Sequence, residues 1–451
     1  MSTVTSPPRP SVERRAVLPG GFIAGATTAG IKASGRPDLA LIMATAGPAA
    51  AAAVFTPNAF AAAPVRLSRR NLAATSDDQR GSFGFASAVI STSGCANAAT
   101  GDAGDTDQEA IGRIVADALG IDGSRVLHLS TGIIGTRLPL DRVEAGVAAV
   151  RPSLRNDDAG LQAAAEALRT TDSVTKAATT SLVMPAPDGE PVTVTITGIC
   201  KGVGMIHPNM ATMLSVVLTD AAVAPEVLWG MLRQAAARTW DQLSVDGDTS
   251  TNDTVFALAS GAAGTAPLSA GSHAAVAFEA ALEAVARDLA RQQAADGEGA
   301  TILITTEVTG AADDADARAV ARAVVSSSLV KAAAHGKDPN WGRIAGAAGN
   351  AVTSPAAVLE AAGLTPDEAA ARATRPVPLD PATLRISIAG HLVFDGAHDG
   401  PVDFDRTAAR AVMDAPEVLI ELDLGQGDGV GEAFGCDLTE QYVIENSEYT
   451  T

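Results

Sequence analysis

The chain has 451 residues, enough for about two or three domains and a large buried core. Hydrophobic residues make up 47% and charged residues 19%, which excludes a largely disordered chain, and the formal net charge of −20 argues against nucleic acid or anionic membranes as partners. The three cysteines, Cys95, Cys200 and Cys436, are far apart, so neither a disulfide framework nor a zinc site is expected.

The start of the chain, residues 1–19, is rich in Pro and Ser and predicts a disordered leader. Arg14-Arg15 ahead of an apolar stretch has some likeness to a twin-arginine export signal. Lys32 and Arg36 follow almost at once, however, without a clear cleavage region. We therefore expect a cytoplasmic protein.

The next elements are predicted from hydrophobic pattern. The apolar run at 39–55 contains Gly47-Pro48 and is slightly too short to span a bilayer, so it predicts a buried strand, a turn and the start of a helix. Strict alternation over 191–201 predicts a strand that ends at Gly202. The apolar run 213–218 predicts a second, buried strand shortly after it.

The C-terminal half predicts helices and strands in a mixed order. Residues 274–293 show apolar positions every three or four residues, which indicates a helix, and 300–310 predict a strand. Residues 313–336 predict one helix, with an acidic first turn and a glycine at its end. Residues 384–396 predict one strand inside the Pro-, Asp- and Gly-rich segment 370–405.

The loop KGVGMIHPNMAT, residues 201–212, is the strongest candidate for chemistry. Its glycines allow sharp turns, Pro208 stiffens it, and the small Ala211 precedes Thr212. A threonine hydroxyl is a weak nucleophile unless a base removes its proton, and the α-amine of an N-terminal threonine is one such base. That role requires a cut between Ala211 and Thr212. The residues alone leave open whether Thr212 is structural or catalytic.

The pattern K-G-x-G-M-I-x-P-N-M-A-T-M-L at 201–214 resembles the self-cleavage segment of the ornithine acetyltransferase family, bifunctional enzymes of arginine biosynthesis. Further blocks similar to the family occur in the family's order: GFIAGATTAGIKASGRPDLALI, STGIIG, VDGDTSTNDT, DPNWGRI, DLGQGDG and the C-terminal NSEYTT. The resemblance implies a layered α/β sandwich of the self-processing amidase and ornithine acetyltransferase type, with a smaller α+β C-terminal lobe.

The resemblance also implies roles for individual residues. Cleavage between Ala211 and Thr212 would free Thr212 as the nucleophile. Thr131 and Gly132, in STG, would form the oxyanion hole that stabilises negative charge on the tetrahedral intermediate. The implied substrate-binding residues are Thr170 (with its neighbour Thr171 as an alternative), Lys201, Thr212, Glu298, Asn446 and Thr451.

The same resemblance divides the chain at the cleavage site. After the leader, residues 20–211 would form the first chain, and 212–310 would complete the catalytic sandwich as the start of the second chain. Residues 311–451 would form the C-terminal lobe, whose tail returns to the active site. We expect the cleaved chains to associate, with two copies of each.

The implied reaction moves the acetyl group of N2-acetyl-L-ornithine to Thr212 and then to L-glutamate. No metal-ligand pattern is present and no cofactor is expected, while acetyl-coenzyme A stays open as a co-substrate. One alternative is a self-processed aminopeptidase or amidase that uses water as acceptor, and another is a protein that only binds an acyl amino acid. Thr92, Cys95, Glu432 and Phe434 depart from the family pattern, as does an insertion-like stretch at 385–405, and these departures bear on the exact substrate.

Overall fold

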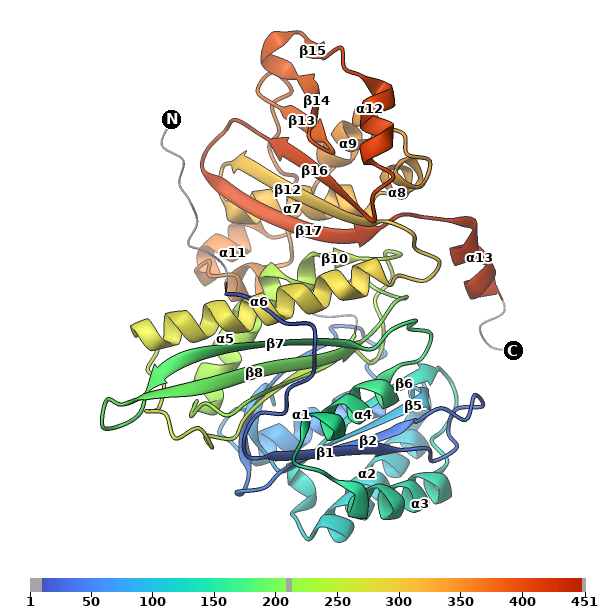
Figure 1. Ribbon diagram of the computed structural model, residues 1–451, viewed down its shortest axis with the longest axis vertical. Coiled ribbons are helices and arrows are strands. Elements are labelled where there is room, and N and C mark those ends of the chain that lie inside the picture. The colour runs from blue at the N-terminus through green and yellow to red at the C-terminus, as the bar shows by residue number, and fades with distance from the viewer. Residues whose placement is uncertain (1–9, 208–212, 448–451) are drawn as a thin grey trace.

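The computed structural model describes residues 10–207 and 213–447 (Figure 1). Two stacked sheets form its larger part. The first, in strand order, contains β1 (Phe22–Thr27), β2 (Leu39–Ala44), β5 (Ala88–Cys95) and β6 (Val126–Ile133). The second contains β4 (Phe83–Ala86), β3 (Ala49–Phe55), β11 (Thr254–Ala259), β9 (Leu214–Thr219), β8 (Pro191–Lys201) and β7 (Lys176–Pro185).

Helices cover the outer face of each sheet. The first sheet packs against α2 (Gly101–Leu119) and α3 (Leu140–Val150), and the second against α5 (Pro225–Arg238) and α6 (His273–Ala295). The core between the two sheets also includes α1 (Ala63–Ala74) and α4 (Asp158–Leu168). The result is the expected layered α/β sandwich, with helices between the two sheets as well as on both outer faces.

A third sheet forms the upper part of Figure 1. Its strand order is β10 (Leu243–Ser244), β17 (Gly429–Cys436), β12 (Leu303–Ala311), β16 (Glu417–Asp423), β13 (Arg385–Ile388), β14 (His391–Asp395) and β15 (Gly400–Pro401). The remaining helices are α7 (Asp314–Ser326), α8 (Ser328–His335), α9 (Trp341–Ala348), α10 (Ala356–Ala361), α11 (Pro366–Arg372), α12 (Arg406–Val412) and α13 (Glu440–Ser447). Helix α6 contacts both β17 of this sheet and β7 of the sandwich.

Several elements agree with the sequence. The alternation at 191–201 forms β8, the periodic stretch at 274–293 lies within α6, and the strands expected at 213–218 and 300–310 correspond to β9 and β12. Strand β8 ends at Lys201 because Gly202 adopts φ +136°, a conformation that side chains disfavour.

Strand β3 corrects one prediction. The run at 39–55 forms two strands, where a strand followed by a helix start was expected. Ala50 and Ala52 face the core beneath α5 and α6, while Ala51 and Ala53 face the first sheet. Burial on both faces therefore outweighs the helix preference of alanine.

Two C-terminal predictions are also corrected. The helix expected at 313–336 is divided at Ser327, whose side chain accepts the Val330 N–H and caps α8, a role that serine favours over a helix interior. The strand expected at 384–396 is a hairpin of β13 and β14. Its turn residues Ala389 and Gly390 both have positive φ, +49° and +79°, as tight hairpins require.

The N-terminal stretch differs from the expected leader from residue 10 onward. Glu13 forms a β-bridge with Thr179 of β7, and Arg14 forms an ion pair with Asp288 of α6 at 3.1 Å. Residues 1–9 lie outside the described residues. None of the helices described is long and apolar enough to cross a membrane.

Candidate active site

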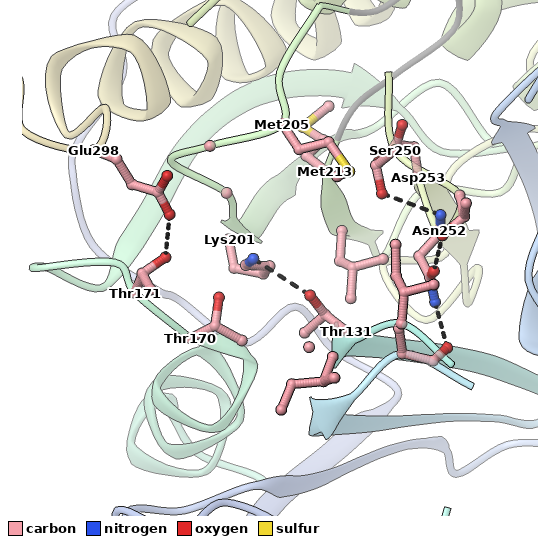
Figure 2. A pocket seen from close by; sticks show the side chains of 18 of the residues that line it. Thr131, Thr170, Thr171, Lys201, Met205, Met213, Ser250, Asn252, Asp253 and Glu298 are labelled. Atoms are coloured by element: carbon pink, nitrogen blue, oxygen red, sulfur yellow. Dashed lines mark hydrogen bonds between the residues drawn. The ribbon is translucent and has the colours of Figure 1, made fainter. Parts of the chain in front are cut away.

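A cavity of about 280 Å³ lies where the ends of β6 and β8 meet the segment after α6 (Figure 2). Its lining includes the predicted site residues Thr131, Gly132, Thr170, Lys201, Glu298 and Asn446. Met213 and Leu214, which directly follow Thr212 in the chain, also line it. Ala211, Thr212 and Thr451 lie outside the described residues. The structure therefore gathers the predicted site residues that it describes into one cavity.

One wall is formed by the end of β6. The ammonium of Lys201 donates to the Thr131 hydroxyl at 3.4 Å, and Lys201 is only 9% exposed (Figure 2). Gly132 has φ +131°, and a Cβ there would collide with the backbone of Gly94 and Cys95. Strands β5 and β6 can approach this closely because position 132 has no side chain.

Asn252 holds this wall in place. Its side-chain amide donates to the carbonyl oxygens of Ala96 at 2.7 Å and Ser130 at 2.8 Å. The Ser130 hydroxyl also donates to Ala96 O at 2.7 Å. Asn252, in the VDGDTSTNDT block, thus joins the loop after β5 to the residue before Thr131.

The opposite wall centres on Glu298. Its carboxylate accepts a hydrogen bond from the Thr171 hydroxyl at 2.8 Å (Figure 2). It also accepts one from the Asn446 amide at 2.9 Å. Both Thr170 and Thr171 line the cavity. Thr171, the alternative to Thr170, is the one that bonds to Glu298. Lys201 and Glu298 therefore present opposite charges to the same space.

The loop between Lys201 and the cleavage segment has a conformation that requires support. Met205 adopts φ +53°, which is uncommon for residues other than glycine, asparagine and aspartate. Asp246 accepts the N–H groups of Met205 and Ile206, the latter at 2.8 Å. Burial raises the pKa of the Asp246 carboxyl, although hydrogen bonds from Asp248, Ile206 and Met205 oppose that change. Asp246 thus maintains a left-handed turn shortly before residues 208–212.

Sequence reasoning missed two buried residues beside the cavity, Asp172 and Lys176. They stand four positions apart in TTDSVTK, a spacing that resembles an ordinary surface ion pair, but both side chains have 0% exposure. The feature of the sequence that could have revealed them is a lysine at the first position of a strand whose first half is buried, β7.

Two of the departures from the family pattern, Cys95 and Glu432, lie outside the cavity lining. Cys95 is buried at the end of β5, with its Sγ 3.2 Å from Thr136 O. Glu432 lies on β17 and pairs with Arg287 of α6 at 2.6 Å. Neither side chain is among those that line the cavity. Within the described ranges, no group of three or more His, Cys, Asp or Glu residues could hold a metal ion.

Comparisons with known proteins cover nearly the whole chain. The model of the ArgJ family matches residues 23–451. The arginine biosynthesis bifunctional protein ArgJ of a Synechococcus strain is 45% identical over 448 residues, covering 96% of each chain. The protein of the same name from Thermus thermophilus is 42% identical over 434 residues, covering 96% of this chain and 99% of that one.

Two solved structures are also similar in sequence. The crystal structure of ArgJ from Bacillus halodurans is 39% identical and covers 52% of this chain and 99% of its own, with a TM-score of 0.45. The ornithine acetyltransferase of Mycobacterium tuberculosis, solved in complex with ornithine, is 38% identical and covers 45% of this chain and 99% of its own, with a TM-score of 0.39. From the family match and the full-length relatives, the chain belongs to the ArgJ family and is an acetyltransferase of arginine biosynthesis.

Proposed function

We propose that the cavity between Thr131, Lys201 and Glu298 is where this glutamate N-acetyltransferase moves the acetyl group of N2-acetyl-L-ornithine to L-glutamate. The observation that carries the proposal is the pair of opposite charges facing one cavity beside Met213. Both amino acids have an α-carboxylate, which the Lys201 ammonium would bind. The α-nitrogen of N2-acetyl-L-ornithine is acylated, so the Glu298 carboxylate would bind the free amino group at the end of its side chain.

The acetyl group would pass through Thr212 in two steps. The α-amine of Thr212, freed by the cut after Ala211, takes the hydroxyl proton while the oxygen attacks the acetyl carbonyl. Thr131 and Gly132 stabilise the negative charge on that carbonyl oxygen. The C–N bond then breaks, ornithine leaves with the proton on its amine, and an acetyl ester of Thr212 is left. The amine of glutamate attacks this ester, and the Thr212 oxygen regains its proton.

The two cleaved chains would stay together because they share one sheet. Strand β8, before the cut, pairs antiparallel with β9, after the cut, from Ile196↔Thr219 to Lys201↔Leu214. Strand β3 pairs with β11 across the same division. Separation of the chains would expose two rows of unpaired backbone groups. We further propose two copies of each chain in the assembly, and action in the cytoplasm.

The acyl acceptor is tested by following ornithine release. Purified protein is supplied with N2-acetyl-L-ornithine alone, with added L-glutamate, and with acetyl-coenzyme A and L-glutamate in place of N2-acetyl-L-ornithine. We expect multiple turnovers only when glutamate is present. Equal ornithine release without glutamate, with free acetate as the product, would identify an amidase instead. Formation of N-acetylglutamate in the third mixture shows that acetyl-coenzyme A is also a donor.

A further inference from the structure

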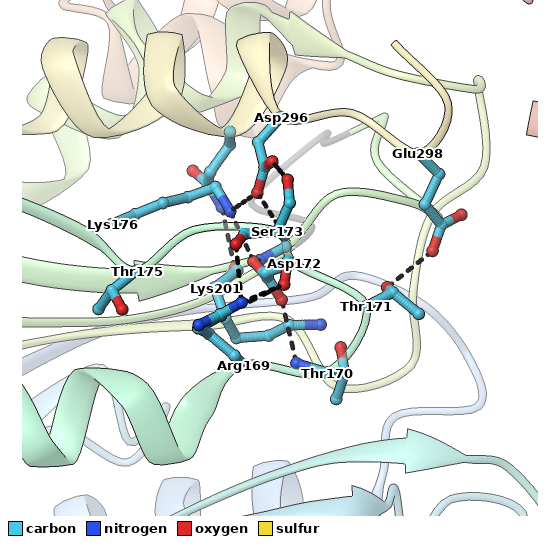
Figure 3. Close-up of polar contacts among 12 residues, drawn as sticks. Arg169, Thr170, Thr171, Asp172, Ser173, Thr175, Lys176, Lys201, Asp296 and Glu298 are labelled. Carbon is cyan, nitrogen blue, oxygen red and sulfur yellow. Dashed lines mark hydrogen bonds and ion pairs between the residues drawn. The ribbon is translucent and has the colours of Figure 1, made fainter. Parts of the chain in front are cut away.

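Lys176 is a buried ammonium between two carboxylates (Figure 3). Its Nζ lies 2.7 Å from Asp172 Oδ1 and 2.5 Å from Asp296 Oδ2. The side chains of Lys176 and Asp172 have 0% exposure, and that of Asp296 has 9%. Burial would lower the pKa of Lys176, but the two carboxylates more than reverse this and raise it above its ordinary value. A buried charge of this kind persists only when it is paired.

The two carboxylates hold the segments that supply the substrate contacts. Asp172 accepts the Gly202 N–H at 2.8 Å and the Thr170 N–H at 3.1 Å. Asp296 accepts the N–H of Ser173 at 3.1 Å and also its hydroxyl. Gly202 directly follows Lys201, Thr170 lines the cavity itself, and Asp296 stands two positions before Glu298. The cluster therefore joins the three segments that form the cavity walls.

Lys201 is the second cation near Asp172. Burial would raise the pKa of the Asp172 carboxyl, yet the ammonium groups of Lys201 and Lys176 hold it well below its usual range. Figure 3 shows Lys201 passing beside Asp172 with its ammonium on the Thr170 side. That ammonium donates to the Thr131 hydroxyl across the cavity. The same carboxylate thus attracts two ammonium groups, of which only Lys201 faces the cavity.

We propose that Lys176 is a positioning residue for substrate binding, because it neutralises Asp172 and Asp296 and so leaves the Lys201 ammonium in the cavity. Without Lys176, Asp172 would lose the ammonium that lies 2.7 Å from its Oδ1, and its attraction for the Lys201 ammonium would no longer be offset. Lys201 would then turn toward Asp172 and away from the substrate carboxylate. This role rests on the proposed function, in which Lys201 binds that carboxylate.

The test compares Lys176→Met with the double variant Lys176→Met/Asp172→Asn. The single variant leaves Asp172 without its buried partner. We expect the KM for N2-acetyl-L-ornithine and for L-glutamate to rise roughly 10- to 100-fold, the range for losing one charge-assisted hydrogen bond, with a smaller change in kcat. The double variant removes the charge that attracts Lys201, so its KM should return to within about threefold of wild type.

A merely structural role predicts that the Tm falls in the single variant and recovers in the double variant, because one unpaired buried charge destabilises the fold more than loss of the whole pair. It predicts no change in either KM of the folded protein. The proposal is contradicted by an unchanged KM in Lys176→Met, or by a KM in the double variant as high as in the single one. If Lys176→Met does not fold, Lys176→Gln is measured in its place. A KM raised about tenfold in Lys176→Gln that returns toward wild type in Lys176→Gln/Asp172→Asn supports the proposal, and an unchanged KM in Lys176→Gln contradicts it.

Arg233→Met is the matched control. Arg233 is a buried cation paired with Asp241 at 3.0 Å, and its side chain does not line the cavity. We expect its loss to lower the Tm without changing either KM. The dissociation constant of ornithine, measured by calorimetry in every variant, separates the positioning role of Lys176 from the proposed acetyl transfer. A wild type that transfers no acetyl group overturns the proposed function, while the change in ornithine affinity still decides the role of Lys176.

Discussion

The side-chain amide of Asn446 donates a 2.9 Å hydrogen bond to Glu298, which lies 148 positions earlier in the chain. Helix α13, which carries Asn446, buries none of its own residues. Polar links at its start include the hydrogen bond from the Thr439 hydroxyl to Gly299 O at 2.7 Å and the contact of His335 Nε2 with Glu440 Oε2 at 3.5 Å. A few hydrogen bonds, rather than a packed apolar face, therefore hold α13 against the cavity.

Asn446→Ala should raise the KM for N2-acetyl-L-ornithine about tenfold, because the Glu298 carboxylate loses the hydrogen bond from the Asn446 amide. Gln441→Ala is the control on the same helix, since Gln441 bonds only to the exposed Glu445 in the described structure. Steady-state kinetics with each substrate varied in turn measure the effect. An equal rise in the control would show that general loosening of α13, and not the bond to Glu298, is responsible.

Thr131→Val should lower kcat by roughly 100-fold with a smaller change in KM, as expected for the loss of one oxyanion donor. Thr131→Ser keeps the hydroxyl that accepts from Lys201 and should retain most of the activity. Single-turnover acetylation of the enzyme isolates this step from product release. A valine variant that acetylates as fast as wild type would remove Thr131 from the oxyanion hole.

Gly204→Ala should displace the Glu298 carboxylate, because a Cβ at position 204 would overlap both of its oxygens. The carboxylate ends a flexible side chain and can move, so we expect a Tm close to wild type together with a higher KM. Gly230→Ala is the control, since a Cβ there meets nothing within 4 Å. The prediction is wrong if the KM of Gly204→Ala matches that of Gly230→Ala.

We expect the buried His128, on β6, to make the folded protein less stable in acid. Burial lowers the pKa of His128 to about 3, from an ordinary value of 6.5. Between these values the unfolded chain binds a proton that the folded chain does not. The free energy of unfolding should therefore decrease by about 1.4 kcal/mol per pH unit as the pH falls below about 6, while stability above pH 7 is unaffected.

Urea unfolding of wild type and His128→Asn between pH 7.5 and 5 measures this slope. His207, whose pKa burial lowers to about 4, adds a second contribution of the same sign and stays in both proteins. The difference in stability between the two proteins should therefore change with pH by the contribution of His128 alone. A constant difference across this range would show that His128 is not the group responsible.

The hydrophobic pattern of a short stretch predicted those elements whose burial follows directly from that pattern. The alternation at 191–201 yielded β8, whereas the alanines of β3 gave no local sign that both faces are buried. The family blocks pointed to residues that, where the structure describes them, line one cavity. The blocks did not reveal the bonds of Thr171 to Glu298 or of Lys176 to Asp296. These partners are separated by 127 and 120 positions, and only the packing of α6 beside β7 brings them together.

The most direct test of acetyl transfer through Thr212 is intact-mass analysis of the wild type and Thr212→Ala, each before and after incubation with N2-acetyl-L-ornithine. We expect two wild-type fragments that meet at Ala211 and Thr212. The fragment that begins at Thr212 should gain the mass of one acetyl group and lose it again when L-glutamate is added. Thr212→Ala should give one uncut chain without acetyl. An uncut wild-type chain, or an acetyl group on the other fragment, would contradict the account.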